Sequence, residues 1–328
     1  MDNDAYKSAI EIVGGEQYML MSPLVQAQAT ENTRGVGNKN WVLDAIASTM
    51  VVLPPLVEQK RIVAKIEELL PLVDRYAASY EKLEQFNAKF PEDMKKSILQ
   101  YAIQGKLVEQ RPEEGTGKEL YRQIQTEKQR LIKEGKIKKE KPLPEIAEDE
   151  IPFDIPGSWK WVRVAQIVTL NPKNDLADDL ETSFIPMPCV MDGFRNQHTF
   201  EIKLWKDIKK GFTHFAEGDV GVAKITPCFQ NRKSVIFRNL KNGYGAGTTE
   251  LTVVRTINDT VLPEYLLWLF KTEYFIANGV KSFTGTAGQQ RIHKDYLATC
   301  LIPLPPLAEQ KRIVAKLDEI LPLCERLK

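Results

Sequence analysis

The hydrophobic residues between positions 62 and 90 recur with alternating spacings of four and three residues. This spacing predicts a long helix with a single apolar seam, the heptad pattern of a coiled coil. Asn87 falls in the seam, where a polar residue commonly fixes the register of pairing, and Pro71 predicts a kink or a break in the helix. The seam consists of Ile62, Ile66, Leu69, Val73, Tyr76, Tyr80, Leu83, Asn87 and Phe90.

The first part of this helix occurs twice in the chain. Residues 53–75 read LPPLVEQKRIVAKIEELLPLVDR, residues 304–326 read LPPLAEQKRIVAKLDEILPLCER, and 17 of the 23 positions are identical. Because both copies carry the same apolar face, we expect them to pack on each other in an antiparallel pair. In the second copy the apolar positions are Ile313, Leu317 and Ile320. The alternative is that each helix packs on the core of its own domain.

The repeat divides the chain into five expected segments. Residues 33–38 align with residues 284–289 in the same register, so the N-terminal segment is expected to be the end of a domain whose complete copy comes later. The segments are a domain remnant (1–52), a helical spacer (53–110), a charged linker with a helix over Glu119–Lys133 (111–150), the complete domain (151–303) and the start of the second helix (304–328).

The segment 151–303 has the pattern of a β-rich domain with packed helices. β-branched runs bounded by Gly, Asn or Pro predict strands at Val220–Ile225, Ser234–Phe237 and Glu250–Val254, and Trp159–Leu170 also has strand character. Pro263–Asn278 is rich in Leu, Trp and Phe and predicts an amphipathic helix. With the repeated helices, the pattern predicts an α+β fold in which long helices form an antiparallel coiled-coil-like spacer.

Composition narrows the class of protein. The chain has 43% hydrophobic and 27% charged residues, which is typical of a globular protein. It has no apolar run long enough for a membrane span and no apolar signal core at its start. The four cysteines stand far apart and the three histidines have no zinc-type spacing. We therefore expect reduced thiols, a cytoplasmic location and no metal site.

Motifs for catalysis are incomplete in this chain. Gly115–Lys118 is similar to a phosphate-binding loop, but its first glycine is missing and Glu119 replaces the hydroxyl that binds magnesium. Asn171–Asn174 is similar to an adenine methyltransferase motif, but it lacks the aromatic residue that stacks on a flipped base. We therefore expect no catalytic residues and no cofactor in this chain.

Positive charge is concentrated between Arg195 and Lys241, where ten lysines and arginines face four acidic residues. Clustered cations attract phosphates and release counterions. Exposed amides, guanidinium groups and hydroxyls on loops can read base edges, and the loop Thr226–Lys233 and the segment Thr286–Arg291 supply them. The expected DNA-binding residues are Lys203, Lys206, Lys209, Lys210, Lys224, Thr226, Gln230, Asn231, Arg232, Lys233, Gln289, Gln290 and Arg291. The alternative for each loop is an ordinary solvated hairpin.

Four blocks of the sequence resemble those of a known family, and they stand in the order found there. They are KKSILQYAIQGKLVEQ, GDVGVAKITPCFQNRKSV, TGTAGQQRIHKDYL and PLPPLAEQKRIVAKL. They resemble the specificity subunits of type I restriction–modification systems. Against that pattern, most of the first target-recognition domain is missing, and the second helix stops at Lys328.

The resemblance implies a function built on two target-recognition domains, each of which reads half of a split DNA site. Conserved helices between them would set the gap and dock the methyltransferase subunits. A restriction endonuclease and translocase subunit would join for cleavage. S-adenosylmethionine, ATP and Mg would belong to these partners. Adenine methylation of host DNA and cleavage of foreign DNA would follow.

Several alternatives stay open at this point. The chain could be a fragment, a truncated inactive allele or a half-subunit that pairs with another specificity chain. It could also be a coiled-coil scaffold that does not touch DNA, or an enzyme in its own right.

Overall fold

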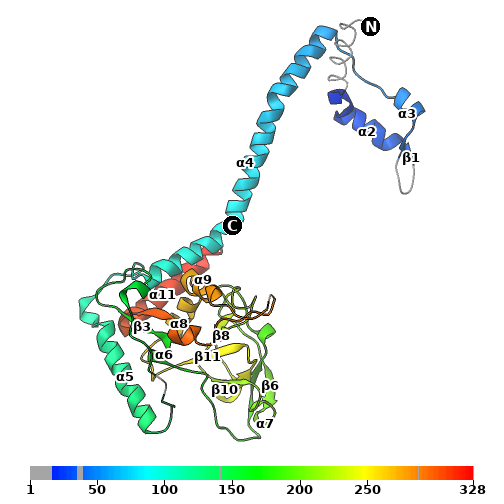
Figure 1. The fold of residues 1–328 in the computed structure, drawn as a ribbon. Helices are drawn as coiled ribbons and strands as arrows, with labels where there is room; N and C mark the ends of the chain where they lie inside the picture. The colour runs from blue at the N-terminus through cyan, green and yellow to red at the C-terminus, as the bar shows by residue number, and fades with distance from the viewer. Residues whose placement is uncertain (1–16, 35–39, 140–141, 287, 328) are drawn as a thin grey trace. The chain divides into compact units, whose positions relative to one another are not determined.

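The computed structural model describes residues 17–34, 40–139, 142–286 and 288–327 (Figure 1). The described residues fall into two compact units, which divide between Asn87 and Ala88. Parts of the expected segments 1–52 and 111–150, and one position of the 286–291 segment, lie outside the described residues. The division into five segments stays a prediction.

The first unit has little interior of its own. It contains α2 (Pro23–Asn32), the antiparallel pair β1 (Thr33–Arg34) and β2 (Asn40–Trp41), α3 (Leu43–Ala47) and most of the long helix α4 (Leu56–Ile103). Val25 is its one hydrophobic side chain that is fully buried among the residues described. The stability of α4 therefore depends on its own hydrogen bonds and on whatever covers its apolar seam.

Helix α4 is continuous over 48 residues and passes through Pro71. Of the two outcomes predicted for Pro71, a kink or a break, the break is wrong. A proline removes one main-chain hydrogen bond, and the turns before and after it keep theirs. The second copy behaves in the same way, since α11 (Leu307–Cys324) contains Pro322 and ends two residues later.

The second unit is built on two four-stranded sheets and a two-stranded ribbon. The first sheet has the order β6-β5-β10-β7, the second has the order β4-β11-β8-β9, and β12 pairs with β3. Within the first sheet β10 runs parallel to β5, whereas the other pairs are antiparallel. The strands are β3 (Lys160–Arg163), β4 (Val168–Leu170), β5 (Glu181–Ile185), β6 (Glu201–Leu204), β7 (Thr213–Ala216), β8 (Val220–Ala223), β9 (Ser234–Ile236), β10 (Tyr244–Gly247), β11 (Leu251–Thr256) and β12 (Leu301–Leu304).

Helices pack on this framework from several parts of the sequence. They are α5 (Gly117–Lys133), α6 (Val164–Ile167), α7 (Trp205–Ile208), α8 (Pro263–Phe270), α9 (Glu273–Lys281), α10 (Tyr296–Thr299) and α11, with short 3-10 turns at Pro112–Glu114, Glu148–Glu150, Met187–Cys189 and Lys241–Gly243. The predicted α+β class, with a long helix beside a β-rich domain, is confirmed.

The helix expected over residues 263–278 is two helices. Helix α8 ends at Phe270 and α9 begins at Glu273. The Thr272 hydroxyl accepts a hydrogen bond from the amide of Phe275, which is the geometry of a helix N-cap. This cap starts a new helix and turns the chain between the two.

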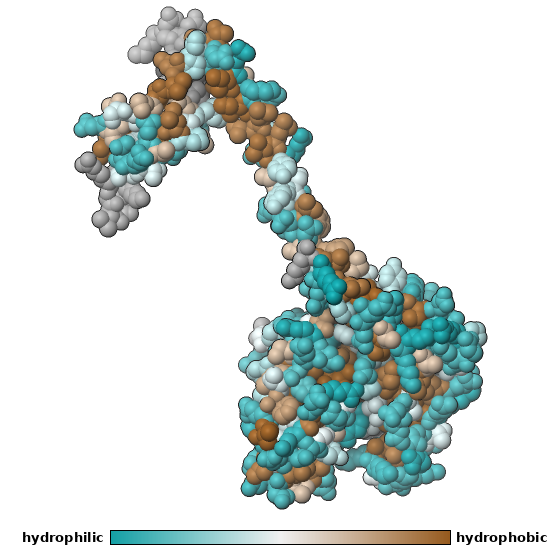
Figure 2. Space-filling view, turned by 180° about the vertical axis from the view of Figure 1, so that it is seen from behind, coloured by the Kyte–Doolittle hydropathy of each residue, from teal (hydrophilic) through white to brown (hydrophobic). Residues whose placement is uncertain are grey.

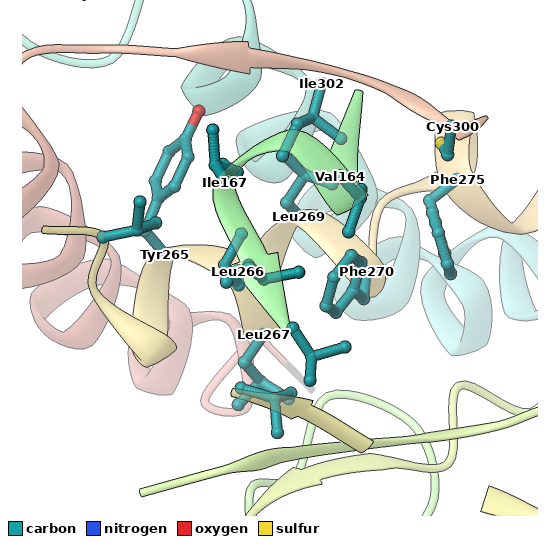
Figure 3. Packing of buried hydrophobic residues seen from close by; sticks show 14 of the residues in the cluster. Val164, Ile167, Tyr265, Leu266, Leu267, Leu269, Phe270, Phe275, Cys300 and Ile302 are labelled. Carbon is teal, nitrogen blue, oxygen red and sulfur yellow. The ribbon is translucent and has the colours of Figure 1, made fainter. Parts of the chain in front are cut away.

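The core of the second unit centres on α8. Figure 3 shows five of its side chains, Tyr265, Leu266, Leu267, Leu269 and Phe270, in one cluster with Val164 and Ile167 of α6, Phe275 of α9 and Ile302 of β12. Each of these side chains is at most 2% exposed. The same core takes in Leu99, Ala102 and Ile103 at the end of α4. The last turns of α4 are thus part of this domain's interior.

Helix α11 is also part of that interior. Ile313 and Leu317 are each 1% exposed in the core, and Ile320 is half-buried. This placement corrects the expectation that Ile313 and Leu317 are the pairing face of the second helix, because their own domain already covers them. The pairing of residues 304–326 with residues 53–75 joins two separately described units and stays a prediction.

Each copy of the repeat contains the same local hydrogen bond at the start of its helix. The Gln310 side chain donates to the carbonyl oxygen of Pro305 at 3.0 Å, and Gln59 donates to that of Pro54 at 2.8 Å. In the second copy the Gln310 side chain also accepts from the amide of Leu262 at 3.0 Å. The Gln in LPPLxEQ therefore fixes the entry into both helices, which supports the reading of the repeat as one structural element used twice.

Candidate nucleic-acid interface

The loop Thr226–Lys233 connects β8 and β9, which pair antiparallel with Val220 opposite Ile236 and Val222 opposite Ser234. The loop is held by its own main chain: the amide of Asn231 donates to Pro227 O at 2.9 Å and that of Lys233 to Cys228 O at 3.0 Å. The strands predicted on either side of the loop are confirmed as β8 and β9, and together they form a hairpin.

An aromatic anchor fixes the loop to the helices. Phe229, in the middle of the loop, is 1% exposed and contacts the rings of Phe275, Phe283 and Tyr296. The sequence prediction did not include Phe229 as part of the site, although a phenylalanine between exposed polar residues is a signal of an inward-facing anchor. With Phe229 inside, its neighbours Gln230 and Asn231 are exposed.

The second expected segment lies beside the first, although about 60 residues separate them in the sequence. The amide of Thr226 donates to Gln290 O at 2.9 Å, and the amide of Ile292 donates to Lys224 O at 2.9 Å. A bridge between Ile225 and Arg291 continues this contact. The structure therefore brings the two predicted base-reading segments together into one surface, which we call the amide surface. Its exposed amides are Gln230, Asn231 and Gln289, with Gln290 half-buried.

Arg232 does not belong to the exposed part of this surface. It is 8% exposed, its Nε donates to Lys271 O at 3.0 Å, and its guanidinium forms an ion pair with Glu273. A base-reading arginine needs free N–H groups at the surface. The expectation that Arg232 reads a base is therefore corrected: its side chain joins the loop to the α8–α9 junction.

Three other residues expected to bind DNA already have partners within the domain. Arg291 forms a bidentate ion pair with Glu250, with N–O distances of 2.9 and 2.7 Å, and this pair lowers the pKa of Glu250. The Thr226 hydroxyl is hydrogen-bonded to Gln230, and Lys233 is half-buried with its amine 3.4 Å from Met187 O. Arg291 is 44% exposed in its side chain, so it could exchange Glu250 for DNA at low cost.

The lysines at 203–210 lie in β6 of the other sheet, in α7 and just after α7. Lys203 is in β6 and Lys206 is in α7, and Figure 1 shows these elements and α9, on which the loop packs, at different ends of the unit. Lys209 pairs with Asp178 at 2.6 Å, and Lys203 lies over the ring of Phe184. Lys206 and Lys210 are exposed. The basic region of the sequence is thus two separate surfaces in the fold.

An ion pair with a buried carboxylate supports the hairpin. Asp219, just before β8, is 3% exposed and accepts from Nε and Nη2 of Arg255 in β11, each at 2.8 Å. It also accepts from the amide of Ala216 at 2.8 Å. Burial raises the pKa of Asp219, and the Arg255 charge and hydrogen bonds oppose that effect. The pair ties β8 to its neighbour β11.

The near-match to a phosphate loop has a structural explanation. Thr116 and Glu119 form a capping box: the amide of Glu119 donates to the Thr116 hydroxyl, and the amide of Thr116 donates to the Glu119 carboxylate. These contacts start α5, which agrees with the predicted helix, and they use the amides of Thr116 and Glu119 within the protein. In the part of the chain that the structure describes, no group of three His, Cys, Asp or Glu side chains could hold a metal ion.

The apolar seam of α4 is largely uncovered. Its exposed members are between 42% and 70% accessible, while Ile66 is half-buried. Figure 2 shows hydrophobic side chains at the surface of this helix. The exposed members are Ile62, Leu69, Val73, Tyr76, Tyr80, Leu83 and Phe90. Among the described helices none has the length and apolar character that a membrane span requires.

Comparison with known proteins places most of the second unit in one family. Residues 156–327 match the family model described as type I restriction modification DNA specificity domain. The chain is 49% identical over 235 residues to the EcoAI specificity subunit and 46% identical to the EcoEI specificity subunit, both type I restriction enzyme subunits of Escherichia coli. Each match covers 71% of this chain, and the chain spans 40% of the length of either relative.

Solved structures give a weaker likeness. The HsdS subunit from Thermoanaerobacter tengcongensis is 20% identical, with a TM-score of 0.41, over 96% of this chain and 63% of the other. The family match and the two E. coli relatives carry the assignment. The matched residues 156–327 include the whole amide surface.

Proposed function

Because the chain belongs to the type I restriction–modification DNA specificity family, we propose that it selects the DNA sequence on which a type I restriction–modification complex acts. The observation that carries this proposal is the amide surface. It presents three exposed amide side chains on two loops that are hydrogen-bonded to each other. Directional hydrogen bonds to base edges need such a fixed scaffold.

The chemistry of the amide surface favours double-stranded DNA. Asn and Gln side chains can form bidentate hydrogen bonds with adenine in the major groove, and a freed arginine can do so with guanine. Gln230, Asn231 and Gln289 are the proposed base readers, with Gln290 and Arg291 at the edge. Lys224 follows β8, and its carbonyl oxygen accepts from the amide of Ile292 beside the second segment, so we assign its side chain to a neighbouring phosphate. In this proposal the domain reads one half of a bipartite site.

The remaining parts of the chain are assigned to assembly. The exposed seam of α4 has the character of a helix-pairing surface, and we assign it to docking of methyltransferase subunits or to pairing with another specificity chain. Catalysis, with S-adenosylmethionine, ATP and Mg, and the endonuclease and translocase activity belong to partner subunits. The chain itself contributes recognition.

The proposed function is tested by selection from a pool of random DNA duplexes. The chain would be purified with its methyltransferase subunits, and the bound duplexes would be sequenced. We expect enrichment of a bipartite motif, with a fixed gap between its halves. A bound pool with the same composition as the input would exclude sequence selection and leave the scaffold alternative.

Lys206 and Lys210 are expected to supply affinity that does not depend on sequence. Replacing both by alanine should reduce the slope of log affinity against log salt by about 0.9 for each lost phosphate contact, with similar weakening on all duplexes. Lys209 should contribute less because Asp178 already pairs with it. Fluorescence anisotropy over a salt series measures the slope. Lys118→Ala removes an exposed lysine outside the basic region and serves as the control; a slope in the double variant equal to that control would rule out this role.

The seam of α4 gives a second assembly prediction. Tyr80→Glu places a charge in the exposed seam and should weaken capture of the methyltransferase subunit by about tenfold or more, because burying an unpaired charge is costly. Ala78→Glu introduces the same charge two residues earlier, at a position outside the seam. Co-purification would be compared between the two variants. Equal capture by both would show that the seam does not dock this partner.

A further inference from the structure

Lys271 is a lysine in the interior of the recognition domain. It follows the apolar end of α8 and is 0% exposed. Its amine donates to the carbonyl oxygen of Gly193 at 2.7 Å and to that of Arg232 at 2.8 Å. Neither partner is a carboxylate. Both acceptors are main-chain carbonyl oxygens, so the Lys271 amine joins two points of the backbone.

Those two points belong to separate loops. Arg232 lies in the loop Thr226–Lys233. Gly193 lies in the loop between β5 and β6, and the main-chain amide of Gly193 donates to Asn231 O at 2.8 Å. In the reverse direction, the carbonyl oxygen of Lys271 accepts from Nε of Arg232 at 3.0 Å. The three segments therefore hold one another in a closed set of contacts, and Asn231 is the last exposed residue before it.

The electrostatics are those of a buried amine that is only partly charged near neutral pH. Burial, and after it the neighbouring Arg232 charge, lower the pKa of Lys271 to about 7. A neutral amine has two N–H groups, which match the two carbonyl oxygens within hydrogen-bond distance. An apolar side chain would fill the space at a smaller desolvation cost. It would leave both carbonyl oxygens without this donor. What the lysine adds over an apolar residue is therefore a pair of hydrogen bonds that hold the two loops in place.

We propose that Lys271 is a positioning residue for base reading, which ties Gly193 and Arg232 together and thereby holds Asn231 and Gln230 in the orientation that contacts the DNA. This inference rests on the proposed function and adds a determinant of specificity that does not touch DNA. It also gives a role to Arg232, whose buried side chain completes the same set of contacts.

The test uses Lys271→Met in the full chain with its methyltransferase subunits. The dissociation constants would be measured for a duplex with the selected motif and for a scrambled duplex. We expect the ratio between the two to fall roughly tenfold or more, within the range of one lost base contact, while binding to the scrambled duplex is unchanged. The motif selected by the variant should degenerate at the position that Asn231→Ala also affects.

A matched control separates positioning from loss of a buried lysine in general. Lys128 in α5 is 8% exposed, and its amine donates to Ala165 O at 2.6 Å and to Val168 O at 3.0 Å. Lys128→Met removes two similar contacts at α6 and β4, away from the amide surface. We expect it to lower thermal stability and to keep the ratio of the two dissociation constants.

The outcomes distinguish the two levels of the proposal. A wild-type complex that does not discriminate between the duplexes overturns the proposed function and this inference with it. Discrimination in the wild type that persists in Lys271→Met, or that falls equally in Lys128→Met, overturns the positioning role alone. If Lys271→Met does not fold, Lys271→Gln takes its place: its side chain is one bond too short for its nitrogen to reach both carbonyl oxygens, so an unchanged ratio in that variant also overturns the positioning role.

Discussion

Replacing Asn231 by alanine is expected to erase recognition at one base position of the DNA target and to leave the rest of the motif intact. The Asn231 side chain is exposed. Its main-chain N–H donates to Pro227 O, and this hydrogen bond fixes the backbone that carries the side chain. Loss of one bidentate contact should cost about 1–3 kcal/mol at that position. Gln230→Ala and Gln289→Ala should each alter a position of the same half-site, because the two loops form one surface.

Sequencing of the DNA that each variant complex selects or methylates would check this result. Gln197→Ala removes an exposed amide from another loop of the same domain and should leave the motif unchanged. The gap between the half-sites is an internal control, because we assign it to the helices. An unaltered motif in all three loop variants, with binding retained, would place base reading elsewhere.

Replacing Arg255 by alanine is expected to destabilise the recognition domain more than any surface change. The substitution leaves the Asp219 carboxylate buried without its charge partner, and breaking a buried pair in this way costs about 3–5 kcal/mol. The carboxylate would keep one donor, the amide of Ala216. Urea denaturation followed by tryptophan fluorescence measures the loss.

The pH dependence of this loss has a definite sign. Burial already raises the pKa of Asp219, and removal of Arg255 should raise it further. A carboxyl whose pKa is higher in the folded state than in the unfolded state favours folding in its protonated form. Its contribution is present at low pH and disappears as the pH rises through the folded-state pKa. The deficit of Arg255→Ala should therefore shrink on acidification.

The double variant Asp219→Asn with Arg255→Ala is the control for the charge. It removes the buried charge and should recover part of the lost stability. A loss of less than about 1 kcal/mol in Arg255→Ala, the size expected for an exposed pair, would mean that the pair is not structural. A deficit that does not change with pH would contradict the titration of Asp219.

Local features of the fold could be predicted because their signals are local. The β-branched runs around Thr226–Lys233 indicate two strands and therefore a hairpin. The break between α8 and α9 was missed, although Thr272 three residues before Phe275 is an N-cap signal. The continuity of α4 through Pro71 was missed because a proline is read in a sequence as a helix breaker. In a helix of 48 residues the loss of one main-chain hydrogen bond is small.

The positions of the candidate site residues depended on contacts that sequence spacing does not reveal. Arg232 has the composition of a base reader, but Glu273 and the carbonyl oxygen of Lys271, about 40 residues later, take its donors. The lysines at 203–210 are near the loop in sequence and lie in β6 of another sheet, in α7 and just after α7. Conversely, Gln289 and Asn231 are far apart in sequence and share one surface. Each difference comes from the order of strands, which only the fold specifies.

We propose above all that this chain determines which DNA sequence is modified. The most direct measurement is the genome-wide map of methylated adenines in cells that carry the methyltransferase subunits, with and without the gene for this chain. We predict that a bipartite motif is methylated only when the chain is present and that Asn231→Ala broadens that motif at one position. Methylation of the same sites in the absence of the chain would contradict the claim.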